Sequence, residues 1–406
     1  MNILIFSKHF WPDNFKINIV AKELVKRGHK ITVLTSDTRY YFLNKKNNYK
    51  KKFLNKKIWH GVNIFYLPVY KKKNYSWIYI FFDYFTHLIS TFFYCHFFLK
   101  KKYDLILVFA TTPIFQAIPA IYFSKLIKKP LFLWVQDLWP ESLRDTGYIK
   151  NQYFLFILKF LVNIIYSLSS VILVQSDGFK KNIISNFKLN KKILTYYNLS
   201  ELKFQKFINK KNKKLLIIYA GNFGQAQDFN TLLKVVNIKK IQSNFYFKLI
   251  GSGKKFNLIK EYIVKNNLSK YVVLKNYLDS KKLYPEILKS DALFITLKKG
   301  NALDETIPGK FQTYLSFGKP IIANCGGITK NIIKKYNIGF ANLPGHHINL
   351  ANNLIKLSRL KLYDKIQIYK KSKILYKKYF EIKNNINYLE MIFEKSLKNN
   401  VKKNLL

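Results

Sequence analysis

Short runs of β-branched and aromatic residues alternate along this chain with stretches whose apolar residues recur at helical spacing. This alternation is typical of parallel βαβ units, in which a helix returns the chain to the start of the next strand. The pattern predicts a strand at Asn2–Phe6, a helix at Phe15–Arg27 that ends at Gly28, and a second strand at Ile31–Thr35. Further strands are expected at Val62–Leu67, Asp104–Ala110, Leu131–Val135, Val171–Gln175 and Ile193–Tyr197.

The alternation stops once and then starts again. Residues 199–214 are polar and lysine-rich without clear periodicity, which indicates an interdomain linker. Beyond it, strands are expected at Leu215–Ala220, Tyr246–Ile250, Tyr271–Leu274, Ala292–Leu297, Pro320–Asn324 and Ile338–Ala341. We therefore predict an α/β chain of two doubly wound, Rossmann-like domains, residues 1–198 and 215–385, that face each other across a deep cleft. Residues 386–406 are expected to form a helical tail that packs back on the first domain.

Lysine dominates the charge of the chain. Lysine and arginine number 71 against 21 acids, which gives a formal net charge of +50, and only Arg27, Arg39, Arg144 and Arg359 are arginines. Sites that read phosphates or bases favour the bidentate guanidinium, so this lysine excess is no sign of nucleic-acid binding. Runs that mix lysine with asparagine, such as residues 208–214, are what A+T-rich codon usage produces by itself. The charge still attracts the chain to an anionic membrane leaflet, at about 1 kcal/mol per nearby lysine.

The termini and the cysteines favour the cytoplasm. The apolar start, Asn2–Phe6, is too short for a secretory signal and lacks a basic leader. Cys95 and Cys325 cannot form a disulfide framework or a four-cysteine zinc site. We expect a cytoplasmic protein that sits peripherally on the inner face of the cytoplasmic membrane.

One apolar stretch, Trp77–Leu99, is long enough to span a membrane. However, Asp83, His87 and His96 interrupt it, and an acid at mid-helix costs roughly 2.5–3.5 kcal/mol on insertion. Three interpretations remain open: an apolar helix packed on a sheet, a helix lying in the membrane interface between lysine clusters, and a spanning helix.

Two glycine-containing turns follow strands of the second domain. Residues 219–229, "YAGNFGQAQDF", end a strand, turn at Gly221 and Gly224 and enter a helix; residues 249–256, "LIGSGKKF", repeat the theme at Gly251. Backbone N–H groups at such turns bind phosphate, although an ordinary βα turn looks the same. Neither turn matches the G-x-G-x-x-G motif and no P-loop is found, so dinucleotide oxidoreductases and P-loop ATPases lose support.

The stretch 300–324, "GNALDETIPGKFQTYLSFGKPIIAN", carries the most chemistry. Pro308 is placed to open a helix, and the N–H groups of Gly309 to Phe311 would then point into the interdomain cleft. Lys310 adds a positive charge beside them, which together makes a site for a pyrophosphate. A capped surface helix with an incidental lysine is the competing interpretation.

Four segments in order resemble family-4 glycosyltransferases of the GT-B fold, in the bacterial O-antigen and capsule branch that contains L-fucosamine transferases. They begin at His9, Leu133, Ala220 and Thr306 and read "HFWPDNFKINIVAKELVKRGHKITVLT", "LWVQDLWPESLRDTG", "AGNFGQAQDF" and "TIPGKFQTYLSFGKPIIA". The resemblance implies a retaining transfer of a sugar, such as N-acetyl-L-fucosamine, from a nucleotide diphosphate to a polyprenyl-diphosphate-linked oligosaccharide. It implies that the first domain faces the acceptor and the second binds the nucleotide sugar.

The resemblance also implies roles for particular residues. The expected catalytic residues are Lys310, Asp137 and Glu305. The expected acceptor-side residues are His9, Asn14, Trp139 and Glu141, with the Trp139 ring as an apolar platform for a sugar. The expected donor-binding residues are Gly221, Asn222, Gly224, Gly251, Tyr277, Lys298, Thr306, Pro308, Gly309 and Thr313.

The chain departs from the family pattern at several of these positions. Where many members carry Glu-x7-Glu, Glu305 is followed by Thr313, so no glutamate–ribose contact is implied. Gly309 replaces a serine, and Gln225, Ala226 and Gln227 stand where an Arg/Lys pair is frequent. These departures place more weight on Lys298 and Lys310.

Such a transfer needs positive charge on the leaving diphosphate and a dry cleft, but no separate base. No Ser/His/Asp cluster and no D-x-D pair at a strand end is found, so we expect no metal and no cofactor. A UDP-sugar 2-epimerase of the same architecture is the alternative enzyme, although it needs more converging carboxylates. A nucleic-acid-binding protein is the alternative of another class, suggested by charge alone.

Overall fold

The computed structural model describes residues 1–37, 55–70, 77–100, 102–208 and 213–404, and its strands form two separate sheets. The first sheet has eight strands in the order β3-β4-β2-β1-β5-β6-β7-β8. Its described pairings are parallel except that of β3 with β4. The strands are β1 (Asn2–Phe6), β2 (Lys30–Ser36), β3 (Asn55–Trp59), β4 (Val62–Leu67), β5 (Leu105–Ala110), β6 (Leu131–Val135), β7 (Val171–Val174) and β8 (Lys192–Thr195).

The second sheet has six strands in the order β11-β10-β9-β12-β13-β14, and its described pairings are parallel. The strands are β9 (Leu215–Ala220), β10 (Phe245–Ile250), β11 (Val272–Lys275), β12 (Ala292–Thr296), β13 (Ile321–Asn324) and β14 (Gly339–Asn342). Two parallel sheets in one chain, each with helices on both faces, confirm the predicted doubly wound α/β fold.

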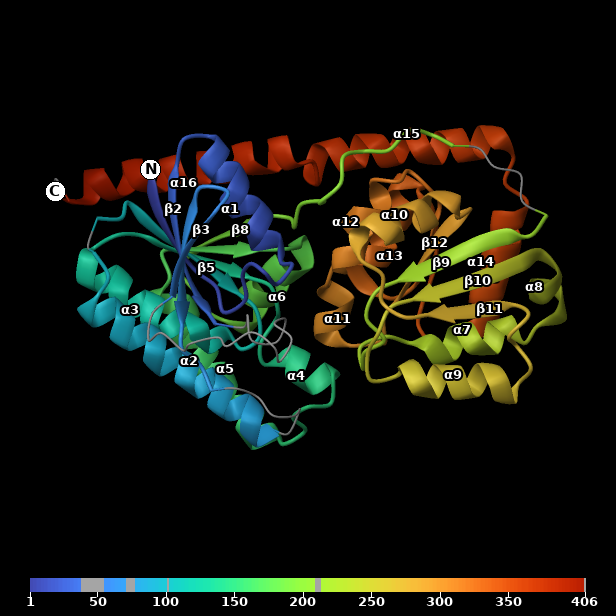
Figure 1. Ribbon diagram of the computed structural model, residues 1–406, viewed down its shortest axis with the longest axis horizontal. Coiled ribbons are helices and arrows are strands. Elements are labelled where there is room, and N and C mark those ends of the chain that lie inside the picture. The colour runs from blue at the N-terminus through green and yellow to red at the C-terminus, as the bar shows by residue number, and fades with distance from the viewer. Residues whose placement is uncertain (38–54, 71–76, 101, 209–212, 405–406) are drawn as a thin grey trace.

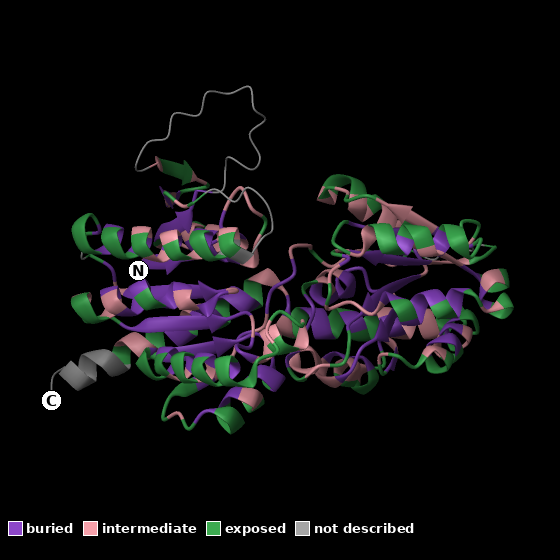
Figure 2. Ribbon diagram, turned by 90° about the horizontal axis from the view of Figure 1, so that it is seen from below, coloured by how far each residue is buried: buried purple, intermediate pink, exposed green. Residues whose placement is uncertain are grey.

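Alternate residues of each first-domain strand enter opposite cores, because successive side chains point to opposite faces. Leu4 and Phe6 join the core under one layer of helices, and Ile3 and Ile5 join the other. Figure 2 shows these buried strands between helices that are exposed on their outer side. The first layer contains α2 (Trp77–Phe97), α3 (Ala117–Ile127), α5 (Gln152–Leu168) and α6 (Asp177–Asn186), and the second α1 (Lys16–Lys26) and α16 (Ile382–Asn404). The 3-10 helix η2 (Ile114–Gln116) and α4 (Glu141–Asp145) lie in loops that follow β5 and β6.

The second domain has the same three-layer plan. One layer contains α7 (Phe229–Val236), α8 (Lys239–Asn244), α9 (Phe256–Lys265) and α14 (His347–Ser358). The other contains α10 (Ser280–Lys289), α12 (Gly309–Leu315), α13 (Gly327–Tyr336) and α15 (Leu362–Tyr379). The short α11 (Asn301–Glu305) lies between the sheets and contacts α4 and α6 of the first domain.

Helices α15 and α16 run one after the other along both domains (Figure 1). Leu375 of α15 belongs to the second-domain core, whereas Leu389 and Phe393 of α16 belong to the first-domain core. Glu390 of α16 also pairs with Arg27 and, at 2.8 Å, with the imidazole Nε2 of His29. The sequence bounds of the linker and the tail stay a prediction, and residues 209–212 and 405–406 of those segments lie outside the described residues.

Strand β3 is a strand that the sequence pattern did not indicate. It pairs antiparallel with β4 through a tight turn at His60 and Gly61, whose φ angles are 47° and 79°. Its residues are mostly exposed, and Lys56 and Lys57 give it the polar surface of an edge strand. The apolar alternation that marks half-buried strands is therefore weak in this segment.

Helix α2 buries three polar side chains and exposes many of its aromatic side chains. Asp83, His87 and Thr91, spaced four residues apart, are all buried, and Asp83 pairs with the buried ammonium of Lys8 at 3.0 Å. Phe81 and Phe85 on the opposite side are 55% and 47% exposed. Burial without a compensating charge lowers the pKa of His87 well below its usual value, with further lowering by Lys8. Among the described residues, no helix combines the length and the apolar character that crossing a bilayer requires.

Candidate functional site

The carboxyl ends of β9 and β10 meet in two glycine turns that pack directly on each other. Gly221 N donates to Ile250 O at 2.9 Å, and Phe223 N donates to Ser252 O at 2.8 Å. A Cβ on Gly251 would stand 1.9 Å from Gly221 O, so only glycine allows this approach. Gly224 N donates to the Gln227 side chain at 2.8 Å. Gly221, Gly224 and Gly251, whose N–H groups were expected to face a phosphate, thus use these groups within the protein, since Gly251 N donates to Lys275 O at 3.0 Å. Asn222, the fourth expected residue of the two turns, is exposed.

Lys310 in the first turn of α12 reaches across to this place. Its Nζ lies 3.7 Å from the centroid of the Tyr219 ring and would be 3.0 Å from a Cβ on Gly221. Helix α12 is held to the end of β9 because Ala220 N donates to the Tyr314 hydroxyl at 2.6 Å. Desolvation lowers the pKa of Lys310 to about 7. No acid of the described chain pairs with this ammonium, so it is available for an anionic ligand.

The start of α12 is open. Pro308 precedes the helix with φ −58° and ψ 138°, and a Cβ on Gly309 would meet nothing within 4 Å. Phe311 N is already bonded to Pro308 O at 2.8 Å, so not every N–H group of this turn is free. Thr313, one turn further along the helix, is half-buried.

A second pair of lysines lies beside the glycine turns. Lys298 follows β12, has an exposed side chain, and donates its backbone N–H to Ala226 O at 2.8 Å. Lys255 Nζ donates to Gln227 O at 2.8 Å, and the pKa of Lys255 is lowered by desolvation and then by the charge of Lys298. Sequence reasoning chose Lys298 and missed Lys255, although "GSGKK" places it directly after the second turn.

The loop around Glu305 bridges the domains. Ser176 Oγ donates to Glu305 O at 2.6 Å, and a Cβ on Gly178 would stand 1.9 Å from a carboxylate oxygen of Glu305. The Glu305 carboxylate therefore lies against the first turn of α6, where desolvation and then Asp304 raise its pKa. Thr306 donates its hydroxyl to Ala302 O at 2.7 Å, which keeps this side chain within its own loop.

The first domain places three expected residues on two loops. Asp137 follows β6, and one of its oxygens, Oδ2, accepts from Thr112 N at 3.0 Å and from Thr112 Oγ1 at 2.8 Å. Burial raises the pKa of Asp137. His9 follows β1 and lies 3.1 Å from the Asp13 carboxylate, and the neighbouring Asn14 is exposed.

Trp139, Tyr277 and Glu141 lie in three different settings. Trp139 is only 6% exposed, packs edge-on against Phe115 and donates to Thr112 Oγ1 at 3.1 Å. The prediction of an open apolar platform is wrong, because this ring belongs to the first-domain core. Tyr277, after β11, is 69% exposed and free to contact a ligand. Glu141 lies apart, on the pocket between α4, α5 and α6.

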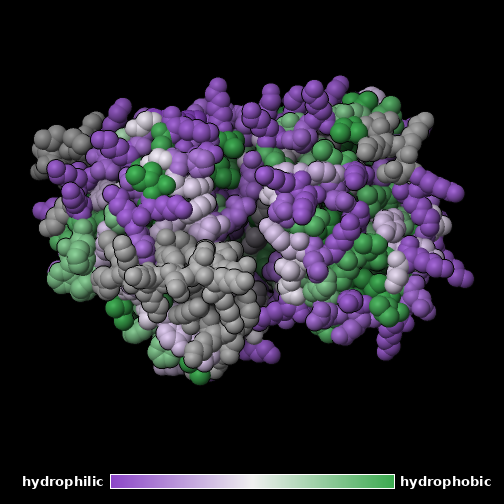
Figure 3. Space-filling model, viewed as in Figure 1, coloured by the Kyte–Doolittle hydropathy of each residue, from purple (hydrophilic) through white to green (hydrophobic). Residues whose placement is uncertain are grey.

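The two halves of the site meet at the gap between the domains. The molecule is hollowed between them in the view of Figure 3. Asp145 of α4 spans the contact, accepting from Ala302 N at 2.6 Å at the start of α11. Groups of three or more His, Cys, Asp or Glu side chains that could hold a metal ion do not occur within the described ranges.

Comparisons with known proteins agree with this architecture. The family described as "Glycosyl transferases group 1" matches residues 200–400. A glycosyltransferase from Rickettsia africae is 16% identical with a TM-score of 0.68, over 98% of this chain and 99% of that one. The Anabaena protein Alr3699/HepE is 13% identical with a TM-score of 0.67, over 97% and 100%. Sucrose-phosphate synthase from Thermosynechococcus elongatus is 12% identical with a TM-score of 0.71, over 97% and 98%.

A comparison with curated protein sequences gave no match. The structural likenesses have low sequence identity and establish the fold, whereas the family match covers the half of the chain that carries Lys310 and both glycine turns. Residues 200–400 therefore belong to the group 1 glycosyl transferases, and the chain that carries them is a glycosyltransferase of the two-domain GT-B fold.

Proposed function

We propose that this protein is a retaining glycosyltransferase that moves a sugar from a nucleotide diphosphate to a lipid-linked oligosaccharide on the inner face of the cytoplasmic membrane. The sugar we expect is an N-acetylated deoxyhexosamine such as N-acetyl-L-fucosamine, and the product a bacterial surface polysaccharide of the O-antigen or capsule type. Neither a cofactor nor a metal takes part in this proposal.

The observation that carries the proposal is the ammonium of Lys310 beside the turn at Gly221, which no acid among the described residues pairs with. Two further lysines lie beside the same turns, since Lys255 Nζ donates to Gln227 O and Lys298 N donates to Ala226 O. Structures of the Anabaena relative contain UDP, UDP with glucose, or UDP-glucose, which supports a nucleotide-sugar donor here. Another similar structure is a lipopolysaccharide outer core galactosyltransferase, WaaB, which supports a cell-surface glycan as acceptor.

The proposed reaction exchanges one bond at the anomeric carbon. The bond from C1 to the diphosphate oxygen breaks, and a bond from C1 to the acceptor oxygen forms on the same face. The acceptor hydroxyl passes its proton to the departing diphosphate, so no further base is required. Lys310 stabilises the charge that grows on the leaving group. Stabilisation of transition-state charge by fixed groups is usually the largest single contribution to catalysis.

A donor screen tests the proposal directly. The purified protein is mixed with UDP- and GDP-sugars and a polyprenyl-diphosphate sugar, and nucleoside diphosphate release is measured with and without the acceptor. Acceptor-dependent release and a glycosylated lipid support the proposal. Conversion of the nucleotide sugar into its C2 epimer without any transfer would instead identify the alternative epimerase.

Asp137→Asn separates acceptor chemistry from loop structure. Asparagine keeps the shape and can still accept the bonds from Thr112, but it cannot carry the charge that orients an acceptor hydroxyl. We expect transfer to fall by about 10²-fold or more, while the slow hydrolysis of the donor, which needs no acceptor, continues. Transfer within about threefold of the wild type would show that Asp137 has only a structural role, in which it connects two loops through its bonds to Thr112. Equal loss of transfer and hydrolysis would place it on the donor side.

Membrane contact is proposed through an apolar surface on the helices of one layer of the first domain. Helices α2 and α3 are adjacent, as are α3 and α5, and an apolar groove runs between α2 and α3. We call these exposed side chains the apolar surface: Ile78, Phe81, Phe82, Phe85, Ile89, Phe92, Phe93, Phe97, Ile118, Leu126, Tyr153, Phe154, Phe156, Ile157, Phe160, Leu161, Ile164 and Leu168.

An anionic leaflet is the partner that fits this surface. Soluble proteins rarely expose so many contiguous apolar side chains, and an aromatic-rich face flanked by lysines is typical of helices that lie at the headgroup level. The charge of +50 adds a long-range attraction to acidic lipid. The inward-facing polar residues of α2 fit the same arrangement, because they leave its aromatic side for lipid.

Vesicle co-sedimentation tests the membrane proposal. We expect the protein to pellet with vesicles that contain acidic lipid and to be released substantially in high salt, which screens the lysines. The double variant Phe81→Ser/Phe85→Ser should bind severalfold more weakly. The control is Leu258→Ser/Val264→Ser, which removes two exposed apolar side chains from α9 of the second domain. Equal binding by both variants, or binding that is insensitive to salt, would contradict the proposed surface.

A further inference from the structure

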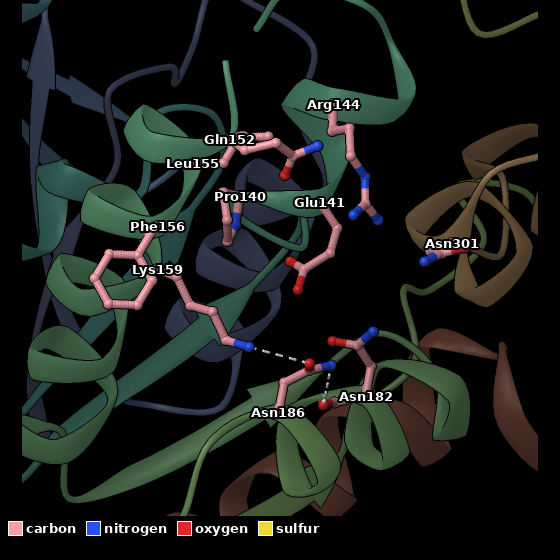
Figure 4. Close-up of a pocket in the computed structure, with 10 residues that line it drawn as sticks. All are labelled: Pro140, Glu141, Arg144, Gln152, Leu155, Phe156, Lys159, Asn182, Asn186 and Asn301. Atoms are coloured by element: carbon pink, nitrogen blue, oxygen red, sulfur yellow. Dashed lines mark hydrogen bonds between the residues drawn. The ribbon is translucent and has the colours of Figure 1, made fainter. Parts of the chain in front are cut away.

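A pocket with both polar and apolar lining residues lies at the edge of the first domain, and neither Lys310 nor the glycine turns belong to its lining. It has a volume of about 360 Å³, within the range of small-molecule pockets. Helices α4, α5 and α6 form its walls, and α11 of the second domain contributes one side chain (Figure 4). The lining residues are Pro140, Glu141, Arg144, Gln152, Leu155, Phe156, Lys159, Asn182, Asn186 and Asn301.

Two buried oxygen atoms in this pocket have no hydrogen-bond partner in the described part of the chain. They are Oε2 of Glu141 and Oδ1 of Asn182, from facing helices. An unpaired buried acceptor costs about 1–3 kcal/mol, which a fold avoids unless something else supplies a donor. Both atoms lack a donor within the described chain, so a ligand that contacts either of them has to supply a hydrogen.

The neighbouring side chains supply hydrogen-bond donors. Lys159 Nζ donates to Asn186 Oδ1 at 3.3 Å, which holds both side chains at the wall. Arg144 and Gln152 add further N–H donors. Phe156, with 71% of its side chain exposed, provides an apolar face at the rim. The pocket therefore combines donors, acceptors and one apolar face in a small volume.

This combination favours one class of ligand. A phosphate brings only acceptors and would meet the buried carboxylate of Glu141. A cationic ligand would be opposed by Arg144 and Lys159. A sugar fits because each hydroxyl both donates and accepts, and because its C–H face can lie on an aromatic ring.

We propose that this pocket binds a sugar residue of the acceptor glycan outside the reaction centre. The source of that sugar rests on the proposed function, whereas the existence of the site does not. Phe156 belongs to both the pocket and the apolar surface. If the apolar surface lies on the leaflet, the pocket is therefore close to the glycan of a membrane-anchored acceptor. Asn301 is the first residue of α11, which ends at Glu305 before α12, so the bound sugar contacts both domains.

Saturation-transfer NMR tests the site without any transfer reaction. The probes are the methyl glycosides of glucose, galactose and N-acetylglucosamine, each added to the full-length protein without a nucleotide sugar. We expect at least one glycoside to bind, with binding at least tenfold weaker in Asn182→Leu and in Glu141→Gln. Asn190→Leu, an exposed asparagine in the loop before β8, is the matched control. Lys310→Ala should bind the glycoside like the wild type.

The outcomes separate this site from the donor site. Removing an unpaired buried acceptor should not lower the melting temperature, so a folded Asn182→Leu protein that still binds the glycosides overturns the proposal. If that variant does not fold, Asn301→Leu at the exposed rim replaces it. Absence of glycoside binding by the wild type, or its displacement by inorganic phosphate, also overturns it. If the protein binds a glycoside but shows no transfer activity, the sugar site is supported and only the proposed function is contradicted.

Discussion

Lys310→Ala is expected to lower turnover by roughly 10²–10³, the scale for losing one preorganised group that stabilises the transition state. The reason is geometric: Nζ stands over the Tyr219 ring beside Gly221, unpaired with any acid that the structure describes. Loss of this charge leaves the departing diphosphate to Lys298 and Lys255. The measurement is single-turnover transfer with saturating donor and acceptor.

The pH dependence of the wild type should report the same group. Burial lowers the pKa of Lys310 to about 7, so the free protein carries the charge below that pH and loses it above. The kcat/KM for the donor should therefore fall as pH rises through about 7, up to tenfold per pH unit. Lys310→Arg keeps its charge at every pH used, so its lower kcat/KM should lack this fall.

Stability measurements guard against a misfolded variant. The lowered pKa means that the folded state disfavours the ammonium, while the unfolded chain holds it up to about pH 10.4. The unfolded state thus binds more protons between these values, and stability rises with pH across that window. Lys310→Met should remove this rise and leave the melting temperature at pH 7 unchanged or higher. A folded Lys310→Ala protein with near-normal turnover would refute the assignment.

Phe393→Ala should destabilise the protein by about 3–5 kcal/mol, the cost of emptying a large buried aromatic site. Phe393 is 0% exposed and its ring packs edge-on against Phe132 at 4.8 Å between centroids. Although it stands near the end of the chain, it fills the core between β6 and α16. Urea unfolding followed by the fluorescence of the buried Trp134 measures the loss.

Met391→Ala is the matched control on the same helix. Its side chain is partly exposed, so the change should stay within about 0.5 kcal/mol. A loss below 1 kcal/mol for Phe393→Ala would contradict the packing of α16 on the first domain. Loss of second-domain structure alone would contradict it as well.

The strands could be read from the sequence because a parallel sheet buries both faces. A short, continuous apolar run such as Leu131–Val135 is typical of a strand buried on both faces, and this strand was predicted to the residue. β3 was not predicted, because an exposed edge strand shows no such apolar run. The orientation of α2 could not be predicted either, because the buried Asp83 pairs with Lys8, and the position of Lys8 depends on the tertiary fold.

The sequence predicted several of the residues that gather at the site, but not the hydrogen bonds and side-chain orientations within it. Lys310 and the two glycine turns follow from strand ends that meet at one edge of a sheet. The internal bonds that occupy Gly221 N and Phe223 N follow from the packing of one turn on the other, which no local pattern reports. The same limit explains Trp139, because an aromatic residue in a loop gives no sign of whether its ring faces the core or the solvent.

Helix α16 has a consequence for how the chain acquires its structure during synthesis. The first domain is discontinuous in sequence, because Ile386, Leu389 and Phe393 complete a core begun by β1, β5 and β6. The second domain closes on residues that are made earlier. The usual order, in which amino-terminal domains finish first, is thus reversed. The nascent first domain therefore exposes this part of its apolar core until α16 has left the ribosome, a state in which a chain is prone to aggregate.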